Sequence, residues 1–399
     1  MTTVNCPQLG EPIRAMAILS IILILLTFWP WSHFGNSLYF GDDLILTSST
    51  NSSTFMQGGL AETEKGDVYV VWVDGNSVYF RSSQDYGVKF GNPVLLSNAN
   101  VSLSPQTGPK ISGTEKGDVY VVWVDGNSVY FRSSQDYGVK FGNPVLVSNE
   151  VASSPQIAAT EKGDVYVVWV DGNSVYFRSS QDYGVKFGNP IRLSNEARIA
   201  SSPQIAATEK GDVYVVWADQ NTASGDIDVI LKRSSNNGME FGSSDRLSRK
   251  NDILSLSPQI DGTERGDVFF VRIDKNNMTG ESEIIFRSSS KMGEDFNSNI
   301  PLDRDPGDFT VSVSPDLAGT ERGDVYVAWS ENNIQFKEIL GNGTWFSETV
   351  TINNISSLGF SPQVAATEKG DVYLLWVNQI NGTETKDLLF KRISHEILE

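Results

Sequence analysis

Residues 63–95 read TEKGDVYVVWVDGNSVYFRSSQDYGVKFGNPVL, and the chain is built from copies of this stretch. The same string returns unchanged at residues 114–146, returns again over residues 160–190, and recurs four more times in diverged form. A Gly-Asp-Val tag marks each copy, and neighbouring tags lie 46 to 57 residues apart. This period is typical of four-stranded β-propeller blades. The seven tags begin at Gly66, Gly117, Gly163, Gly211, Gly266, Gly323 and Gly370.

Every segment of one copy favours a strand or a turn. In the third copy we predict four strands, separated by a tight turn at residues 161–164 and a hairpin at residues 171–173. The second strand is apolar on both faces, which indicates a strand covered on both sides, as in stacked blades. The four predicted strands cover residues 155–160, 165–170, 174–179 and 189–194.

The two ends of the chain predict how the ring closes. The seventh copy stops after its third strand, at residues 388–393. Residues 40–47, before the first copy, match the sequence of the predicted fourth strand of other copies. An N-terminal strand can therefore complete the last blade and remove two exposed sheet edges. We predict an all-β, seven-bladed β-propeller over residues 36–399, because six or eight blades would leave a strand unpaired.

The connection between the third and fourth strands carries a family resemblance. Residues 83–90 read SQDYGVKF, which resembles the Asp box, or BNR repeat, of sialidase-like β-propellers, Ser-x-Asp-x-Gly-x-x-aromatic. The fourth copy keeps the pattern except for Asn236 at the Asp position. In the first three copies Lys89, Lys140 or Lys186 replaces the usual Ser or Thr before the aromatic residue. In that family the box is structural and lies on the rim opposite the active site. The resemblance implies this structural role for Ser83, Asp85, Gly87, Phe90, Ser134, Asp136, Gly138, Phe141, Ser180, Asp182, Gly184 and Phe187.

A hydrophobic segment precedes the repeats. After a short tail of residues 1–14, residues 15–31 (AMAILSIILILLTFWPW) are apolar and end in an interfacial Trp-Pro-Trp pattern. No small-residue cleavage site follows, so we favour an uncleaved signal anchor over a cleaved signal peptide. Arg14 on one side, with Asp42 and Asp43 on the other, predicts that the propeller lies outside the membrane, or is secreted if the segment is cleaved.

Composition agrees with an exported protein. The net charge of −18 disfavours nucleic acid or an anionic membrane as a partner. The single cysteine, Cys6, precedes the apolar segment, so the propeller has no disulfide. Six candidate N-glycosylation sequons occur, at Asn51, Asn100, Asn277, Asn342, Asn354 and Asn381.

No catalytic residues are predicted. The only histidines, His33 and His395, stand near the two ends of the chain, which argues against a His-containing triad or metal site. A sialidase needs three converging arginines, a Tyr–Glu pair and an Asp acid, and the family's Arg-Ile-Pro motif is missing here. The obvious arginines share one repeated third-strand position, so we expect them to radiate and to pair with neighbouring acids. They are Arg81, Arg132, Arg178, Arg233, Arg287 and Arg392.

Residues that break the repeat are better candidates for binding. Arg272 stands where six copies have Trp, and is either a buried paired cation, which we favour, or part of a site. Polar residues open the first strands, and inner strands of a propeller line its channel, so they could form a small ligand or ion site. A water-filled channel is the alternative. The candidate channel residues are Gln156, Gln204, Gln259, Gln363, Lys110 and Asp316.

Three hairpins between second and third strands are longer than the rest, at residues 219–228, 274–283 and 378–387. The resemblance places them on the functional rim. Oxygen atoms of Asp219, Asp226 and Asp228 could bind Ca²⁺, although their spacing matches no EF-hand loop. We otherwise predict no metal and no cofactor.

Our first functional hypothesis is a non-catalytic, membrane-anchored surface module that recognises a glycan or a protein. The alternatives are a sialidase-like glycoside hydrolase and a structural component of the cell envelope. The fold resemblance alone does not decide among them, because propellers host many functions.

Overall fold

The computed structural model describes residues 38–49, 58–97, 108–148, 151–248, 253–305, 314–353 and 357–395. Contacts divide the chain into one unit of Phe40–Ser394, which contains the seven blades, and a second of Met1–Tyr39 with His395–Glu399. The predicted anchor and the sequons at Asn51, Asn100 and Asn354 lie outside the described residues. In the part of the chain that is described, no helix has the length and apolarity to span a bilayer.

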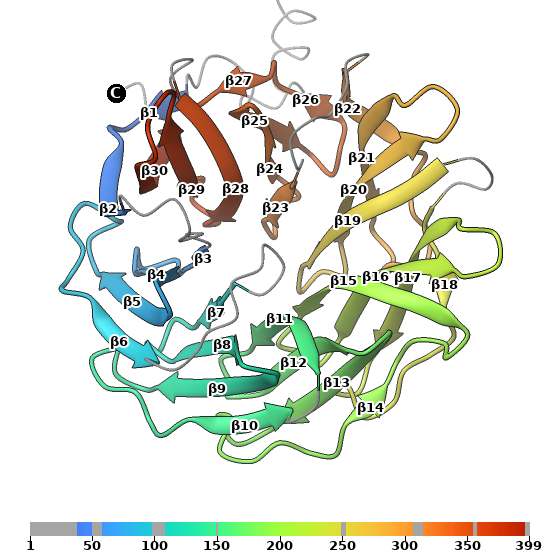
Figure 1. Cartoon of the computed structure of the whole chain (residues 1–399), viewed down its shortest axis with the longest axis horizontal. Coiled ribbons are helices and arrows are strands. Elements are labelled where there is room, and N and C mark those ends of the chain that lie inside the picture. Colours follow the sequence, from blue (N-terminus) through green and yellow to red (C-terminus); the bar gives the residue numbers. More distant parts are fainter. Residues whose placement is uncertain are drawn as a thin grey trace, which may run out of the picture. The chain divides into compact units, whose positions relative to one another are not determined.

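Within the first unit, seven antiparallel sheets form a ring, as predicted (Figure 1). From the channel outward, the first blade consists of β3 (Gly58–Glu62), β4 (Val68–Asp74), β5 (Ser77–Ser83) and β6 (Val94–Ser97), the second of β7 (Lys110–Gly113), β8 (Val119–Asp125), β9 (Ser128–Ser134) and β10 (Val145–Ser148), and the third of β11 (Ala152–Ala159), β12 (Val165–Asp171), β13 (Ser174–Ser180) and β14 (Ile191–Arg192). The fourth blade consists of β15 (Arg198–Ala207), β16 (Val213–Asn221), β17 (Ile227–Ser234) and β18 (Asp245–Arg246), and the fifth of β19 (Ile253–Gly262), β20 (Val268–Asn276), β21 (Ser282–Ser289) and β22 (Ile300–Asp305). The sixth blade consists of β23 (Asp316–Gly319), β24 (Val325–Glu331), β25 (Asn333–Leu340) and β26 (Trp345–Phe346) with β27 (Val350–Thr351), and the seventh contains β28 (Ser357–Ala366), β29 (Val372–Ile380) and β30 (Lys386–His395).

The N-terminal strand closes the last blade. Two short strands, β1 (Leu38–Phe40) and β2 (Leu44–Ser49), precede the first blade in sequence. β2 pairs antiparallel with β30, and Ile45 lies opposite Leu389 (Figure 1). Leu46 is buried among side chains of the first and seventh blades. The predicted closure is therefore confirmed.

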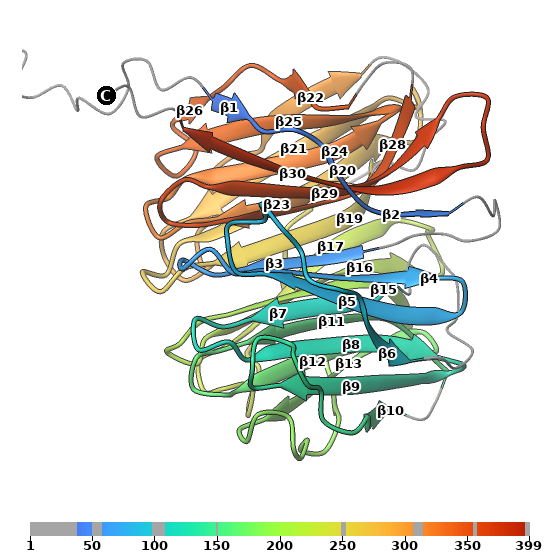
Figure 2. The same ribbon diagram turned by 90° about the vertical axis from the view of Figure 1, so that its left-hand side faces the viewer.

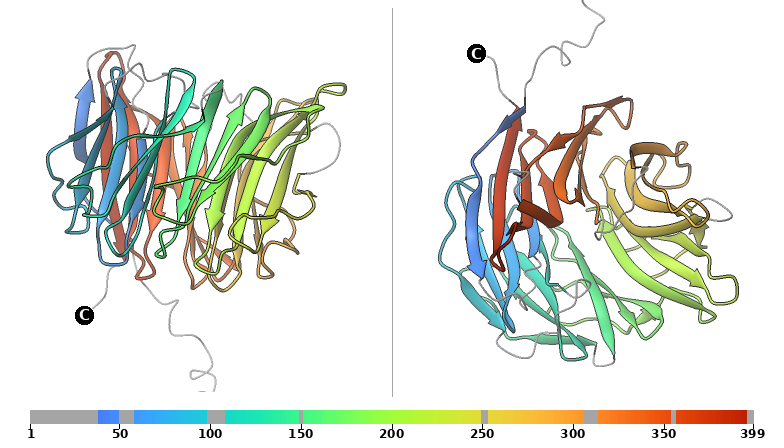
Figure 3. Two further views of the ribbon diagram at one scale, coloured as in Figure 1. Left: turned by 90° about the horizontal axis from the view of Figure 1, so that it is seen from below. Right: turned by 45° about the horizontal axis from the view of Figure 1, so that its top comes forward.

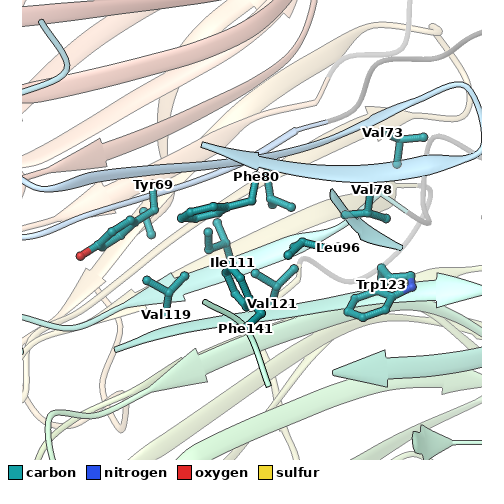
Figure 4. Close-up of a cluster of buried hydrophobic side chains, with 12 residues drawn as sticks. Tyr69, Val73, Val78, Phe80, Leu96, Ile111, Val119, Val121, Trp123 and Phe141 are labelled. Atoms are coloured by element: carbon teal, nitrogen blue, oxygen red, sulfur yellow. The ribbon is translucent and has the colours of Figure 1, made fainter. Parts of the chain in front are cut away.

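Stacked blades bury both faces of each second strand. In β12, Val165, Val167 and Trp169 pack towards the second blade, whereas Tyr166, Val168 and Val170 pack towards the fourth. Figure 4 shows the equivalent layer between the first two blades, where Tyr69 and Phe80 meet Val121 and Phe141. The apolar run that the sequence repeats is thus the source of the inter-blade cores.

The first strands differ from the prediction. β11 begins at Ala152 rather than residue 155, and a bulge interrupts its pairing with β12 between Ser153 and Gln156. Ser154 has a φ of 51° and precedes Pro155, which has no N–H to offer the ladder. At the outer edge, β14 has only two residues.

Hydrogen bonds between neighbouring turns also join the blades. In each Thr-Glu-Lys/Arg-Gly turn the glutamate carboxylate accepts a hydrogen bond from the backbone N–H of the equivalent glutamate in the preceding blade. The series closes on itself when Glu368 donates to Glu64. We call this set the glutamate ring; it comprises Glu64, Glu115, Glu161, Glu209, Glu264, Glu321 and Glu368.

The Ser-x-Asp hairpins lie beside these turns. Ser83 Oγ donates to Asp85 Oδ1 at 2.6 Å, and the N–H groups of Gly87 and Lys89 donate to Ser83 Oγ and Asp85 Oδ1. The same bonds recur in the next two blades, and Asn236 replaces Asp in the fourth. Tyr86 N donates to Gly66 O, which places hairpin and turn on one rim. We call it the turn rim, and the opposite one, formed by the second-to-third strand hairpins, the loop rim. The ring is seen from the side in Figure 2 and in the left view of Figure 3.

Candidate functional site: a polar central cavity

The inner strands of all seven blades enclose a cavity of about 330 Å³. Its walls include all six candidate channel residues, namely Gln156, Gln204, Gln259, Gln363, Lys110 and Asp316. These residues hold the same register position, since each lies opposite the equivalent residue of its second strand. The first blade has Gly59 at this position. The sequence therefore grouped residues that the fold brings together.

Each of the four glutamines follows a β-bulge. The serine two positions before each glutamine has a positive φ of 46° to 51°, a conformation that L-residues seldom adopt. Bulges of this kind re-aim side chains and are common next to functional sites, where backbone strain is retained. The serines are Ser154, Ser202, Ser257 and Ser361.

Three of these glutamines make no side-chain hydrogen bond within the described part of the chain. Among the described residues, the side-chain amides of Gln156, Gln204 and Gln259 form no hydrogen bond with protein groups. Each amide offers two donor hydrogens and an acceptor oxygen. Consecutive blades thus present one continuous wall of amides to the cavity.

The facing wall is charged. Lys110 Nζ donates to Gln363 Oε1 at 3.1 Å, and Asp316 Oδ2 accepts from Val364 N at 2.9 Å. Burial lowers the pKa of Lys110, and the charge of Asp316 opposes this effect. Burial also raises the pKa of Asp316 to about 6, so this carboxyl is mostly ionised at neutral pH.

Two further acids line the cavity and were missed by the sequence analysis. Asp261 accepts hydrogen bonds from Gly262 N and Gly319 N, both at 2.8 Å, and burial raises its pKa to about 6. Burial, followed by the charge of Asp261, raises the pKa of Glu62 to about 8, so Glu62 is mostly protonated at pH 7. The other six blades have Ala or Ser at the register position of Asp261, and Ala or Gly at that of Glu62. Comparing these positions along the repeat would have found both.

Arg272 does not line the cavity. Its side chain is fully buried and forms a two-pronged ion pair with Asp274, with N–O distances of 2.7 and 2.8 Å. Ser255 Oγ donates to the same carboxylate at 2.6 Å, and the guanidinium lies over Phe270. Arg272 is thus the buried paired cation that the sequence analysis favoured, and it lies apart from the candidate site.

The repeated arginines do not converge, as expected, but most of their partners differ from the prediction. Arg81, Arg132, Arg178 and Arg287 donate to backbone carbonyls in the outer strand regions of the preceding blades, at Leu46, Leu96, Val147 and Leu247. The expected acid partners are found for Arg233, which pairs with Asp245, and for Arg392, which pairs with Asp371. The prediction of acid pairing was wrong for the first four, because the edge carbonyls of each blade need donors.

On the loop rim, ion pairs occupy the carboxylates considered for calcium. Arg198 Nε lies 2.5 Å from Asp219 Oδ2, and its Nη2 lies 2.9 Å from Asp228 Oδ2. Asp226 accepts a hydrogen bond from Ser224 at 2.7 Å. Over the described ranges, no group of three or more His, Cys, Asp or Glu side chains is arranged to hold a metal ion.

The described sequons lie on both rims. Asn277 and Asn381 are exposed in long hairpins of the loop rim. Asn342 lies on the turn rim, where its backbone has a φ of 57° and its N–H donates to Gly323 O.

Comparison with known proteins shows relatives in structure only. No family model and no curated protein matches the chain. A protein of unknown function from Dyadobacter fermentans has a TM-score of 0.57 at 12% identity, covering 90% of this chain and 99% of its own. An ulvan lyase, solved with a bound glucuronate–sulforhamnose unit, has a TM-score of 0.61 at 10% identity, and the match covers 86% of this chain and 95% of the lyase. An α-L-arabinofuranosidase from Fusarium graminearum has a TM-score of 0.51 at 9% identity, and the match covers 90% of this chain and 99% of the arabinofuranosidase.

Glycan-active enzymes share this fold. At such identities the likeness concerns the fold alone, and site residues must be argued from this chain.

Proposed function

We propose that the chain is a membrane-anchored cell-surface protein whose propeller recognises a glycan in its central cavity without chemical turnover. The observation that carries the proposal is the wall of three free glutamine amides aimed into one cavity by strained bulges. Kinship with Asp-box propellers is part of the proposal, and the Ser-Asp-Gly hydrogen bonds of the turn rim support it.

The chemistry of the cavity suits a hydroxyl-rich ligand. Glutamine amides both donate hydrogen bonds to sugar hydroxyls and accept hydrogen bonds from them, whereas ionised aspartates only accept. The charge of Lys110 is opposed by that of nearby Asp316. A cavity of about 330 Å³ is at the small end of the usual range of about 300–1,000 Å³ for ligand sites. We therefore expect recognition of the neutral end of a glycan.

Sialidase-type catalysis has little support in the described residues. None of the six repeated arginines lines the cavity, so the carboxylate grip of that family has no counterpart there.

One observation favours a glycoside hydrolase as the second candidate. Glu62, mostly protonated, and Asp261, mostly ionised, share the cavity, and two carboxyls in different protonation states are what hydrolysis of a glycosidic bond requires.

The test is a glycan-array screen of the full chain in nanodiscs, followed by calorimetric titration of the best ligand. We expect Gln156→Ala/Gln204→Ala/Gln259→Ala to weaken binding by about tenfold or more, since each lost hydrogen bond contributes about 1 kcal/mol. The matched control is Gln84→Ala/Gln135→Ala/Gln181→Ala, which alters exposed hairpin glutamines of three blades and should leave binding unchanged.

Turnover assays on fluorogenic glycosides separate the two candidates. Binding without turnover supports recognition alone. Turnover that is lost in Glu62→Gln, while binding persists, supports the hydrolase. If no glycan binds, glycan recognition is wrong, and a protein-binding or structural envelope role takes its place.

A further inference from the structure

Four aliphatic side chains protrude from the turn rim. Val88, Val139, Val185 and Met239 are 72%, 77%, 75% and 61% exposed. They occupy one repeated position, directly after the glycine of the Ser-x-Asp hairpin, in the first four blades. The fifth and sixth blades have Glu294 and Thr344 there. At this repeated position the aliphatic residues are therefore confined to the first four blades; elsewhere on the rim, Met292 and Trp345 of the next two blades are each 44% exposed.

The hairpins hold these side chains away from the protein. Val139 N donates to Asp136 O at 3.1 Å, and the next N–H, of Lys140, donates to Asp136 Oδ1 at 2.9 Å. Since the hairpin is tied from within, Val139 cannot fold back into the adjacent core without breaking these bonds. Lys89, Lys140 and Lys186 follow the three valines and are also exposed.

The chain enters the propeller on the same rim. Gly41 N donates to Arg392 O at 2.9 Å, as Gly91 N donates to Ser82 O at the end of the first hairpin. Phe40 therefore stands where a hairpin of the seventh blade would end. Only residues 32–39 separate it from the apolar segment of residues 15–31, and this tether can reach about 30 Å when fully extended. The seven-residue strand β4 alone spans about 23 Å from rim to rim, so the turn rim is the nearer one to a membrane held by that segment.

We infer that the turn-rim sector of the first four blades rests on the lipid surface, with these four aliphatic side chains in the headgroup region. The inference rests on the membrane anchoring proposed above. The lysines beside the valines can meet lipid phosphates while their stems cover apolar surface. Isolated side chains of this size bind a bilayer weakly, so the anchor supplies attachment and the rim sets orientation.

This orientation directs the long hairpins outward. Each inner strand runs from the loop rim towards its Thr-Glu-Lys/Arg-Gly turn, and Gln156 lies opposite Val168, the middle residue of β12. The long hairpins at residues 219–228 and 274–283 then face away from the membrane, so a ligand can approach the cavity from the loop rim.

The test uses the full chain in the Cys6→Ser background, reconstituted into phosphatidylcholine nanodiscs with and without a lipid-borne quencher. A fluorescent probe is attached at Val139→Cys or, as the matched control, at Asn127→Cys in the exposed hairpin of the same blade on the loop rim. We expect the lipid quencher to reduce emission at position 139 at least twofold more than at position 127. Aqueous iodide should give the opposite order.

A second variant tests the side chains themselves. With the probe at position 139, Val88→Ser/Val185→Ser/Met239→Ser should reduce lipid quenching by about half or more while the protein stays bound to the nanodisc. If the protein stays bound but positions 127 and 139 are quenched equally, the rim inference is wrong and the anchoring stands. If the protein does not associate with lipid at all, both are wrong.

Discussion

At the scale of single residues, the side chains of the cavity owe their properties to where they interrupt the repeat. Glu62 replaces a small residue on an inner strand, so its carboxyl lies among blades rather than in bulk water. Removing a carboxylate from water disfavours its charged form. The protonation states in the cavity therefore follow from the substitution of single residues within an otherwise regular ring.

This predicts a stability that depends on pH. The pKa of Glu62 rises from 4.5 to about 8 on folding, and that of Asp261 from 3.8 to about 6. A raised pKa stabilises the fold fully below the unfolded-state pKa, and this contribution is lost as pH rises through the folded-state pKa. We expect the free energy of unfolding to fall between about pH 4 and pH 8, as measured by chemical denaturation.

Glu62→Gln identifies the residue responsible. The variant should remove the decline between pH 6 and pH 8 and retain the part below pH 6, which Asp261 and Asp316 supply. An unchanged slope between pH 6 and pH 8 would show that Glu62 does not hold its proton in the folded protein.

At the scale of elements, the Ser-x-Asp hairpin joins neighbouring blades through a glycine that approaches an aromatic ring. Gly138 has a φ of 80°, and a Cβ there would lie 2.1 Å from Phe80 of the preceding blade. Gly126, in the other hairpin of the same blade, has a φ of 62° and nothing within 4 Å of its would-be Cβ. The two positions share a backbone preference and differ in packing.

We therefore expect Gly138→Ala to cost about 3 kcal/mol or more, since strain from positive φ adds to overpacking. Gly126→Ala should cost only about 1 kcal/mol, from the backbone alone. Urea unfolding of both variants measures the difference. Equal costs would mean that the contact with Phe80 contributes nothing to stability.

Sequence reasoning found the elements because their signals are local and repeated. A single copy is enough to predict the apolar strand at residues 165–170 and the hairpin at residues 171–173. The segment near residue 44 is recognised as a strand because it matches the fourth-strand sequence of the copies. The bulges were missed because Ser154 adopts a conformation that sterics disfavour for any residue before proline, so the ordinary rule predicts extended backbone there.

The candidate site was found in part for a related reason. Gln156, Gln204 and Gln259 sit at one register position and could be grouped by alignment of the copies. Asp261 lies two positions after Gln259, and Glu62 lies three positions after Gly59, which holds the glutamine position in the first blade. Aligning the copies at the glutamine position alone therefore does not reveal either acid. Arg81 and its equivalents were misjudged because a backbone carbonyl leaves no mark in the sequence.

At the scale of the whole molecule, the ring depends on one strand from the other end of the chain. β2 completes the seventh blade, and Leu46 O accepts a hydrogen bond from Arg81 of the first blade. Strand β2 therefore contacts both blades that meet at the closure, in addition to the bonds of the glutamate ring.

Removing this strand should open the ring. We expect a chain that begins at residue 50 to unfold at a Tm lower by 10 °C or more, or to self-associate through the exposed edge of β30. A chain that begins at residue 36, which keeps β2, is the control. Thermal unfolding and size-exclusion chromatography measure both effects, and equal behaviour of the two chains would contradict a closing role for β2.

The pairing of β2 with β30 also fixes an order of events during synthesis. β2 is made first, yet its partner Leu389 is added roughly 340 residues later. At about 5–20 residues per second, the ribosome needs tens of seconds to supply it. During this interval β2 must avoid pairing with the third strand of every earlier blade, each of which later receives its own fourth strand.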